Sequence, residues 1–217
     1  MRVKEHSPTK TRKRGDTRQR VLKAAGKLFA THGYAATSIS AICNASGVLP
    51  SSIYWEFGNK AGILAAVLED SAERWLDQST RSVVQAMNER RQSGGDGLDA
   101  YFDYMADALA KGPEFLRLML MVALERRHAD PHALEIVRNH RKRSIAAVAR
   151  VLTALGLEEP GLDEETARDV AALIIFCFDG AFTAAQIDAD PRDLRRIFAL
   201  LRSALVAQLA PLALKRP

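Results

Sequence analysis

Helical spacing of apolar residues runs through this chain and constrains its fold more than any other feature. From residue 17 onward, five apolar side chains recur at i, i+1, i+4, i+7 and i+8, namely Val21, Leu22, Ala25, Leu28 and Phe29. That spacing places them on one face of an α-helix. Similar patterns continue along the chain, and no alternating run of convincing length indicates a half-buried strand. The sequence therefore predicts an all-α fold with about nine or ten helices.

Gly and Pro residues predict where these helices end. The tight turn at Ser46-Gly47 separates a short helix at 38–45, capped by Thr37, from a helix at 50–57 that Pro50 opens. Longer helices are expected at about 60–91, 98–111, 113–127, 132–155, 163–187 and 191–210. The predicted organisation is a flexible basic arm at 1–15, an N-terminal three-helix helix-turn-helix DNA-binding domain at 16–60, and a larger helical domain at 61–217.

Basic residues concentrate in the first quarter of the chain. Residues 1–60 contain eleven Lys or Arg and three Asp or Glu, a net charge of +8, whereas the other 157 residues carry −3. This asymmetry favours a polyanion-binding module joined to a part that need not contact the polyanion.

Several classes of protein find no support in the sequence. Cys43 and Cys177 lie far apart in apolar helical patterns, which argues against a disulfide framework or a zinc finger. Glu125 and His128 have an ExxH spacing and His132 follows, but Asp130-Pro131 interrupts the helix between the histidines, so neither a metal nor a cofactor is expected. No GxSxG, P-loop or GxGxxG motif occurs, which argues against an enzyme.

Two further absences bear on localisation. The N-terminus has no apolar segment of the secretory type, and no run reaches about 18 apolar residues. We expect a cytoplasmic protein with no membrane partner.

Residues 16–68 contain five motif segments: Thr17–Leu22, Leu28–Tyr34, Thr37–Ile39, Gly47-Val48 and Ser52–Lys60. Together these segments resemble the N-terminal domain of the TetR/AcrR family of transcriptional regulators. The resemblance implies a bacterial homodimer that binds a pseudo-palindromic double-stranded DNA operator through its third helix and responds to a small-molecule effector. When bound to DNA, such a protein is associated with the nucleoid.

The resemblance also assigns roles to individual residues. Carried over by position, Thr37 and Ser38 contact phosphate, Pro50, Ser51 and Ser52 lie nearest the base edges, and Tyr54, Trp55 and Lys60 contact the DNA backbone. The chain departs from the family at Leu49, where a capping Ser or Thr is usual. Residues 50–52 also lack the Arg, Asn or Gln side chains that read bases in bidentate fashion. Specificity is therefore expected to depend on thymine methyl contacts, DNA shape or the basic arm.

The larger domain is expected to contain a hydrophobic ligand pocket and a dimer surface. The pocket candidates are Trp75, Met87, Tyr101, Tyr104, Met105, Phe115, Met119, Phe176 and Asp179. The dimer candidates on the last two helices are Phe178, Phe182, Leu194, Ile197, Phe198, Leu201 and Leu205. Three positions for Asp179 stay open: facing solvent, paired with an Arg across the dimer, or orienting a polar ligand atom.

These observations predict a ligand-responsive repressor, released from its operator by a small, mostly hydrophobic effector. The alternatives are an activator of the same family, a non-specific architectural DNA binder, and a helical carrier of hydrophobic ligands without sequence-specific DNA binding.

Overall fold

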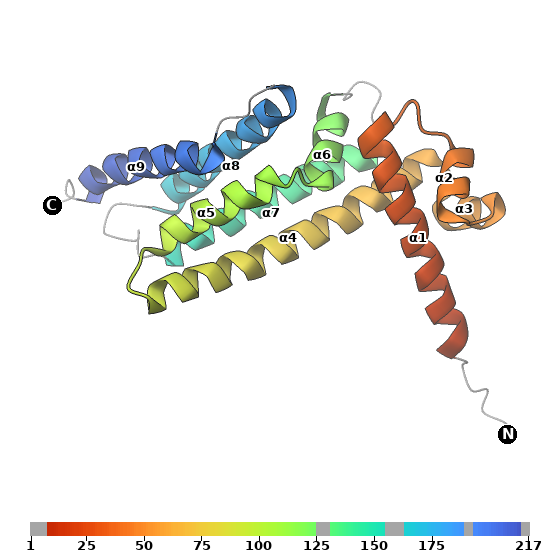
Figure 1. The fold of residues 1–217 in the computed structure, drawn as a ribbon, viewed down its shortest axis with the longest axis horizontal. Coiled ribbons are helices and arrows are strands. Elements are labelled where there is room, and N and C mark those ends of the chain that lie inside the picture. Colours follow the sequence, from red (N-terminus) through yellow and green to blue (C-terminus); the bar gives the residue numbers. More distant parts are fainter. Residues whose placement is uncertain (1–7, 125–130, 155–162, 189–192, 214–217) are drawn as a thin grey trace. The chain divides into compact units, whose positions relative to one another are not determined.

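The computed structural model describes residues 8–124, 131–154, 163–188 and 193–213, and within these ranges the chain forms nine α-helices and no strand (Figure 1). The helices are α1 (Pro8–His32), α2 (Ile39–Ser46), α3 (Pro50–Phe57), α4 (Lys60–Gln92), α5 (Gly97–Ala110), α6 (Glu114–Leu124), α7 (Pro131–Ala154), α8 (Glu164–Ile187) and α9 (Leu194–Ala213). The predicted all-α fold is confirmed. All helix starts except that of α1 lie within about three residues of the prediction.

The first helix begins earlier than the sequence analysis predicted. Residues 8–15 were expected to belong to a flexible arm, yet α1 starts at Pro8 and continues to His32. Proline fits the first turn of a helix because its missing N–H has no intrahelical partner there, and the following Lys and Arg residues are good helix formers. The basic segment therefore extends α1, and residues 1–7 of the predicted arm lie outside the described residues.

The described residues divide into two compact units. The first comprises residues up to Glu73 together with Arg117–Val137, and the second comprises Arg74–Leu116 together with Arg138 onward. The predicted boundary at 60 and 61 does not coincide with this division because α4 runs unbroken from Lys60 to Gln92. Residues 60–73 of α4 thus belong to the first unit and residues 74–92 to the second.

The core of the first unit lies where α1 meets α2 and α3. Val21, Leu22, Ala25 and Phe29 of α1 are at most 2% exposed, as their helical spacing predicts. Ile42 of α2 and Ile53 of α3 are equally buried. These contacts hold the two short helices in place, since neither is long enough to be stable alone.

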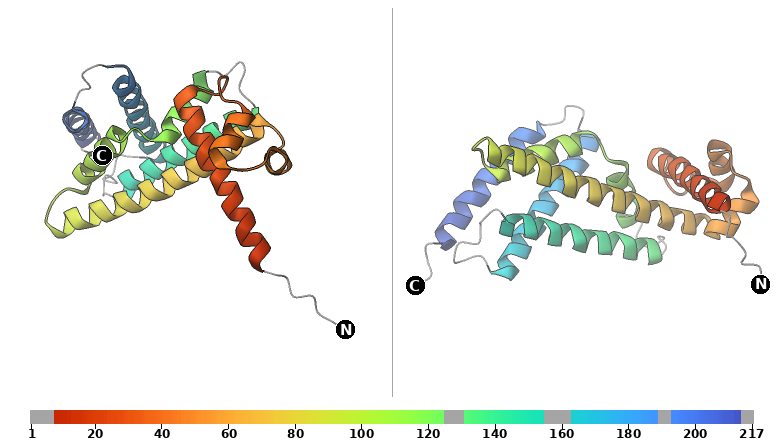
Figure 2. Two further views of the ribbon diagram at one scale, coloured as in Figure 1. Left: turned by 45° about the vertical axis from the view of Figure 1, so that its right-hand side comes forward. Right: turned by 90° about the horizontal axis from the view of Figure 1, so that it is seen from below.

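The core of the second unit is an aromatic cluster shared by α5, α8 and α9. The ring centroids of Phe178 and Phe198 lie 4.7 Å apart, and Phe102 lies about 6 Å from both. Helix α9 packs against α5 (Figure 2). Acidic residues of α5 also pair with Arg195 and Arg202 of α9.

Candidate nucleic-acid interface and ligand cavity

The turn between α2 and α3 is built as the sequence predicts. Gly47 adopts a left-handed backbone conformation, with φ of 65°, and its N–H donates to the carbonyl oxygen of Cys43 at 2.8 Å. A side chain at this position would strain the backbone, which explains the glycine. Val48 is buried and fills the angle between the two helices, and Ile53 fixes α3 to the core.

Arg20 secures the same turn from α1. Its guanidinium donates to the carbonyl oxygen of Ser46 at 2.8 and 3.1 Å and to that of Gly47 at 3.0 Å. A cation at the end of α2 also complements the negative end of the helix dipole. This role was not predicted, because the sequence shows only that Arg20 adds to the basic excess and lies in the motif segment Thr17–Leu22.

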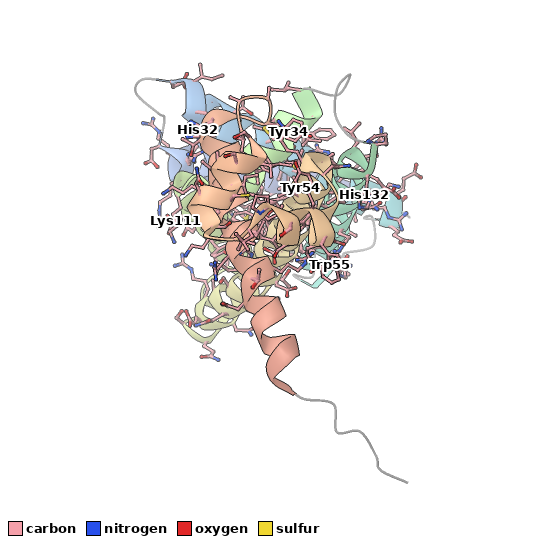
Figure 3. The ribbon with its side chains drawn as sticks, turned by 90° about the vertical axis from the view of Figure 1, so that its right-hand side faces the viewer. His32, Tyr34, Tyr54, Trp55, Lys111 and His132 are labelled. Carbon is pink, nitrogen blue, oxygen red and sulfur yellow. The ribbon has the colours of Figure 1, made fainter. Side chains whose placement is uncertain are left out.

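The outer surface of α3 presents small hydroxyls and two aromatic rings. Pro50, Ser51 and Ser52 are exposed, as are Tyr54 (52%) and Trp55 (69%). Figure 3 looks onto the end of the chain that contains α1–α3, with Tyr54 and Trp55 labelled on α3. Leu49 at the N-cap makes no side-chain hydrogen bond and is 71% exposed, so the predicted lack of a cap is confirmed.

A second link holds α3 against α1. Arg18 pairs with Glu56 at 3.5 Å, and its guanidinium lies 5.8 Å from the centre of the Phe57 ring. Together with Arg20, this pair fixes the orientation of α3 from two sides. The exposed surface of α3 is therefore presented by a supported helix.

Thr37 and Ser38, to which the resemblance assigned phosphate contacts, differ in their exposure to solvent. Thr37 is 3% exposed, and its hydroxyl donates to the carbonyl oxygen of Gly33 at 2.8 Å. The cap of α2 is Ser38, whose Oγ accepts from the N–H of Ala41 at 3.0 Å, so the predicted cap at Thr37 is wrong. Thr37 closes the loop after α1, whereas Ser38 is exposed at the start of α2.

Lys60 also turns inward. Its Nζ donates to the carbonyl oxygens of Tyr34 at 2.9 Å and Thr37 at 3.0 Å, and it lies 4.3 Å from the centre of the Tyr34 ring. These contacts satisfy backbone acceptors of the loop between α1 and α2. In this structure Lys60 therefore holds this loop, and its contact with the DNA backbone stays a prediction.

A cavity of about 270 Å³ lies within the second compact unit. Its lining comes from α4, α5, α7 and α8 and includes four predicted pocket residues, Trp75, Met87, Tyr101 and Met105. The rest of the lining is Leu76, Ser79, Thr80, Val83, Val84, Ser144, Ala147, Val148, Arg150, Val151 and Ile175. Burial raises the pKa of the Tyr101 hydroxyl well above its ordinary value, so this ring is neutral at physiological pH.

The other five pocket candidates do not line this cavity. Phe115 packs edge-on against His140 with ring centroids 4.3 Å apart, and Met119 is buried in the first unit. Tyr104 is half-buried. Phe176 is 56% exposed beneath the guanidinium of Arg141, which also pairs with Asp179. Asp179 thus has an arginine partner within its own chain.

Comparisons with known proteins agree with the motifs of the first unit. Residues 21–67 match the family model described as "Bacterial regulatory proteins, tetR family". The HTH-type transcriptional repressor SCO4008 of Streptomyces coelicolor is 32% identical over 133 residues, which cover 61% of this chain and 62% of that protein. The repressor ComR of Escherichia coli is 41% identical over 58 residues, 27% of this chain and 28% of ComR.

The fold comparison extends over nearly the whole chain. A TetR transcriptional regulator from Chloroflexus aurantiacus is 26% identical, with a TM-score of 0.70 over 91% of this chain and 97% of that one. Residues 21–67 thus carry the DNA-binding segment of the TetR family, and the fold of the whole chain is similar to that of a TetR regulator. The aligned part spans less than two thirds of the length of SCO4008. None of these three relatives is named as an enzyme, in agreement with the expectation from the missing catalytic motifs.

The predicted dimer residues fall into two groups. Phe178, Phe182, Phe198 and Leu205 are at most 8% exposed and pack inside their own unit. Leu194 and Leu201 are half-buried, and Ile197 is 41% exposed. The aromatic residues were assigned to the wrong face because a helix that is apolar all round gives no signal for which side faces its own core.

A different set of apolar residues remains exposed on α8 and α9. We call it the exposed α8–α9 set: Leu173 (46%), Phe176 (56%), Ile187 (76%), Ile197 (41%), Leu200 (62%) and Val206 (37%). On α8 the members lie three and eleven residues apart, so they share one helical stripe. Helix α8 is also long and apolar enough to cross a membrane by composition, and only 22% of its most apolar window is buried.

The weak metal candidate gains no support from the described residues. Glu125 and His128 lie outside them, and within them no group of three His, Cys, Asp or Glu side chains gathers. His132 is exposed at the start of α7.

Proposed function

We propose that this chain is a ligand-responsive transcriptional repressor that binds a pseudo-palindromic operator as a homodimer. The observation that carries the proposal is the exposed surface of α3, which is held from behind by Ile53 and from the side by Arg18 and Arg20. A short, supported helix with an exposed N-terminal half fits the major groove of B-DNA. Relatives named as repressors favour repression over activation.

Some residues of α3 contact the DNA bases, and others contact the DNA backbone. Pro50, Ser51 and Ser52 form a small tip that approaches base edges closely, and Tyr54 and Trp55 contact the sugar-phosphate backbone. Ser38 adds a hydroxyl at the start of α2, where free N–H groups favour a phosphate. With no bidentate reader at 50–52, shape and thymine methyl contacts supply much of the specificity.

Homodimer formation is supported by the exposed α8–α9 set. Six large apolar side chains exposed on two neighbouring helices are unusual in a monomer and match the apolar core of a subunit interface. Helices α8 and α9 of two copies would form a four-helix interface. Contact with the second copy would also bury the apolar surface of α8, which explains why so little of this helix is buried within one chain of a cytoplasmic protein.

Release by ligand follows from the geometry that a dimer needs. Two copies of α3 must enter successive major grooves about 34–36 Å apart. A ligand that binds more tightly to a conformation with another spacing shifts the population away from the DNA-binding state. The cavity of the second unit, which includes part of α4, is the proposed effector site.

The test uses DNA isolated by repeated selection from a random pool. Substituting Trp55→Ala or Ser52→Asp on α3 should weaken binding of the selected duplex by about tenfold or more while the fold is retained. Exposed Lys23 of α1, changed to Gln, serves as a control for non-specific loss of charge. Wild-type affinity in both α3 variants would overturn the proposal.

A carrier of hydrophobic ligands is the second candidate, and the cavity favours it. It predicts tight ligand binding in a protein for which selection enriches no DNA. Equal affinity for selected and random DNA would instead support the architectural binder.

A further inference from the structure

Four polar residues interrupt the otherwise apolar lining of the cavity in the second unit. Trp75, Met87, Tyr101 and Met105 provide aromatic and thioether surface. The polar members of the lining are Ser79 and Thr80 on α4 and Ser144 and Arg150 on α7. A pocket with a few polar groups on an apolar background orients its ligand through those groups.

Ser79 carries a hydroxyl with no compensating contact. Its Oγ is shut off from solvent and has no hydrogen-bond partner in the described part of the chain. A buried hydroxyl without a partner is unfavourable, so its presence beside a cavity calls for a partner atom from the occupant.

Ser144 provides a second hydroxyl, which is held in place by His140. Its Oγ lies 3.2 Å from Nε2 of His140, a side chain that is 5% exposed and packs against Phe115. Nδ1 of the same ring has no partner among the described residues. If the Ser144 hydroxyl accepts from Nε2–H, its own proton is available for a ligand oxygen.

Charge narrows the class of ligand further. Arg150 is the one charged residue in the lining, and its side chain is exposed. The lining contains no Asp or Glu that could balance a cation. An acidic end group is therefore favoured over an ammonium group in this cavity.

We propose that the cavity binds a small apolar acid, a molecule of about ten non-hydrogen atoms whose carboxylate meets Ser79, Ser144 and Arg150. The size of the ligand is inferred from the cavity volume: an apolar cavity of about 150 Å³ accommodates benzene, and this one measures about 270 Å³. The inference rests on the proposed function insofar as it treats this cavity as the effector site.

A series of phenylpropyl compounds tests the end group at nearly constant shape. The probes are 3-phenylpropanoate, 3-phenylpropan-1-ol, 3-phenylpropan-1-amine and propylbenzene. Binding is measured by isothermal titration calorimetry and by Trp75 fluorescence in a Trp55→Phe background, where Trp75 is the sole remaining tryptophan. The acid should bind most tightly and the amine most weakly, with at least about a tenfold difference. An amine that binds as tightly as the acid, or no binding by the acid, would overturn the inference.

Substitutions assign the preference to individual residues. Ser79→Ala should weaken binding of the acid about fivefold and leave propylbenzene unchanged, whereas Ser82→Ala on the same helix, outside the lining, should change neither. Arg150→Gln should reduce the preference for acid over alcohol about fivefold. Ala147→Phe, which fills the cavity, should abolish binding of all four probes. Unchanged affinity for the acid in the Ser79 variant, together with an unchanged preference for acid over alcohol in the Arg150 variant, would contradict the proposal.

DNA binding is measured on the same protein to separate the two claims. If the acid binds but leaves operator affinity unchanged, the ligand class stands and the effector role in the proposed function fails. If operator binding is intact and no acid binds, the ligand class fails and the DNA-binding proposal stands.

Discussion

At the scale of single residues, Thr37 and Lys60 both donate hydrogen bonds to backbone carbonyls of the first unit. Thr37 and Lys60 occupy motif positions that imply phosphate contact, yet Thr37 is buried and Lys60 bonds to backbone carbonyls. Both satisfy acceptors in the loop that follows α1. A sequence lists donors but does not show which unsatisfied carbonyl lies nearest, and so these two roles could not be predicted.

Substituting Lys60 by Met tests its structural role. The variant loses charged hydrogen bonds to Tyr34 and Thr37 and the contact with the Tyr34 ring, so the free energy of unfolding should fall by about 2 kcal/mol. Urea denaturation measures this change, and exposed Lys27→Met is the control. Unchanged stability together with weaker DNA binding would restore the phosphate role.

His140 predicts a dependence of stability on pH. Burial, aided by the nearby Arg143, lowers the pKa of His140 from 6.5 to about 4. Because the unfolded chain takes up the proton first, the contribution of His140 is complete above about pH 6.5 and is lost as pH falls towards 4. Between pH 7 and pH 5 the loss amounts to about 2 kcal/mol.

The measurement is the free energy of unfolding of wild type and His140→Phe across this range. The wild type should lose stability more steeply than the variant between pH 6.5 and 4. Parallel curves would show that His140 is not buried in its neutral form.

At the scale of elements, most of the helices could be predicted from the sequence. Glycine and proline breaks and the apolar spacing gave α2 to α9 because each helix has a periodic face and a chemical stop signal. The start of α1 was missed because Lys and Arg occur both in exposed helices and in flexible arms, and so they do not distinguish the two. The inner and outer faces of α8 could not be separated because apolar residues surround that helix, and on α9 apolar residues such as Leu200 and Val206 also lie outside the predicted stripe.

Charge complementarity joins α5 to α9, a pairing that no local pattern indicates. Asp96 and Asp99 pair with Arg202, while Asp103 and Asp107 pair with Arg195. Burial alone would raise the pKa of the Asp96 carboxyl, but the Leu98 N–H and the Arg202 guanidinium hold it below its ordinary value. Three acidic residues on α5 and its N-cap Asp96 thus meet two arginines seven residues apart on α9.

Substituting Arg202 by Gln should lower the free energy of unfolding by about 1 kcal/mol at low salt and by less at high salt. The side chain is partly shielded, and one cation serves two carboxylates. Arg168→Gln, which removes an exposed pair within α8, should have a smaller effect. Equal effects of the two substitutions would indicate that the α5–α9 pairs contribute nothing beyond a surface ion pair.

At the scale of the whole molecule, the exposed α8–α9 set predicts self-association. Leu200→Lys places a charge in the proposed interface of both copies and should weaken dimerisation about a hundredfold. Analytical ultracentrifugation gives the mass, and Leu124→Lys is a control at a leucine that is 84% exposed in the other unit. A Leu200→Lys protein that remains dimeric would place the interface elsewhere.

The central claim is that α3 reads operator DNA as part of a dimer, and fluorescence anisotropy with two duplexes tests it most directly. One duplex carries the sequence selected from the random pool, and the other carries the same bases in scrambled order. The account predicts binding of the selected duplex at least about a thousandfold tighter than the scrambled one at physiological salt. It also predicts an affinity that falls steeply as salt is raised, because backbone contacts supply much of the binding. Equal affinity for both duplexes, or no binding at low salt, would contradict it.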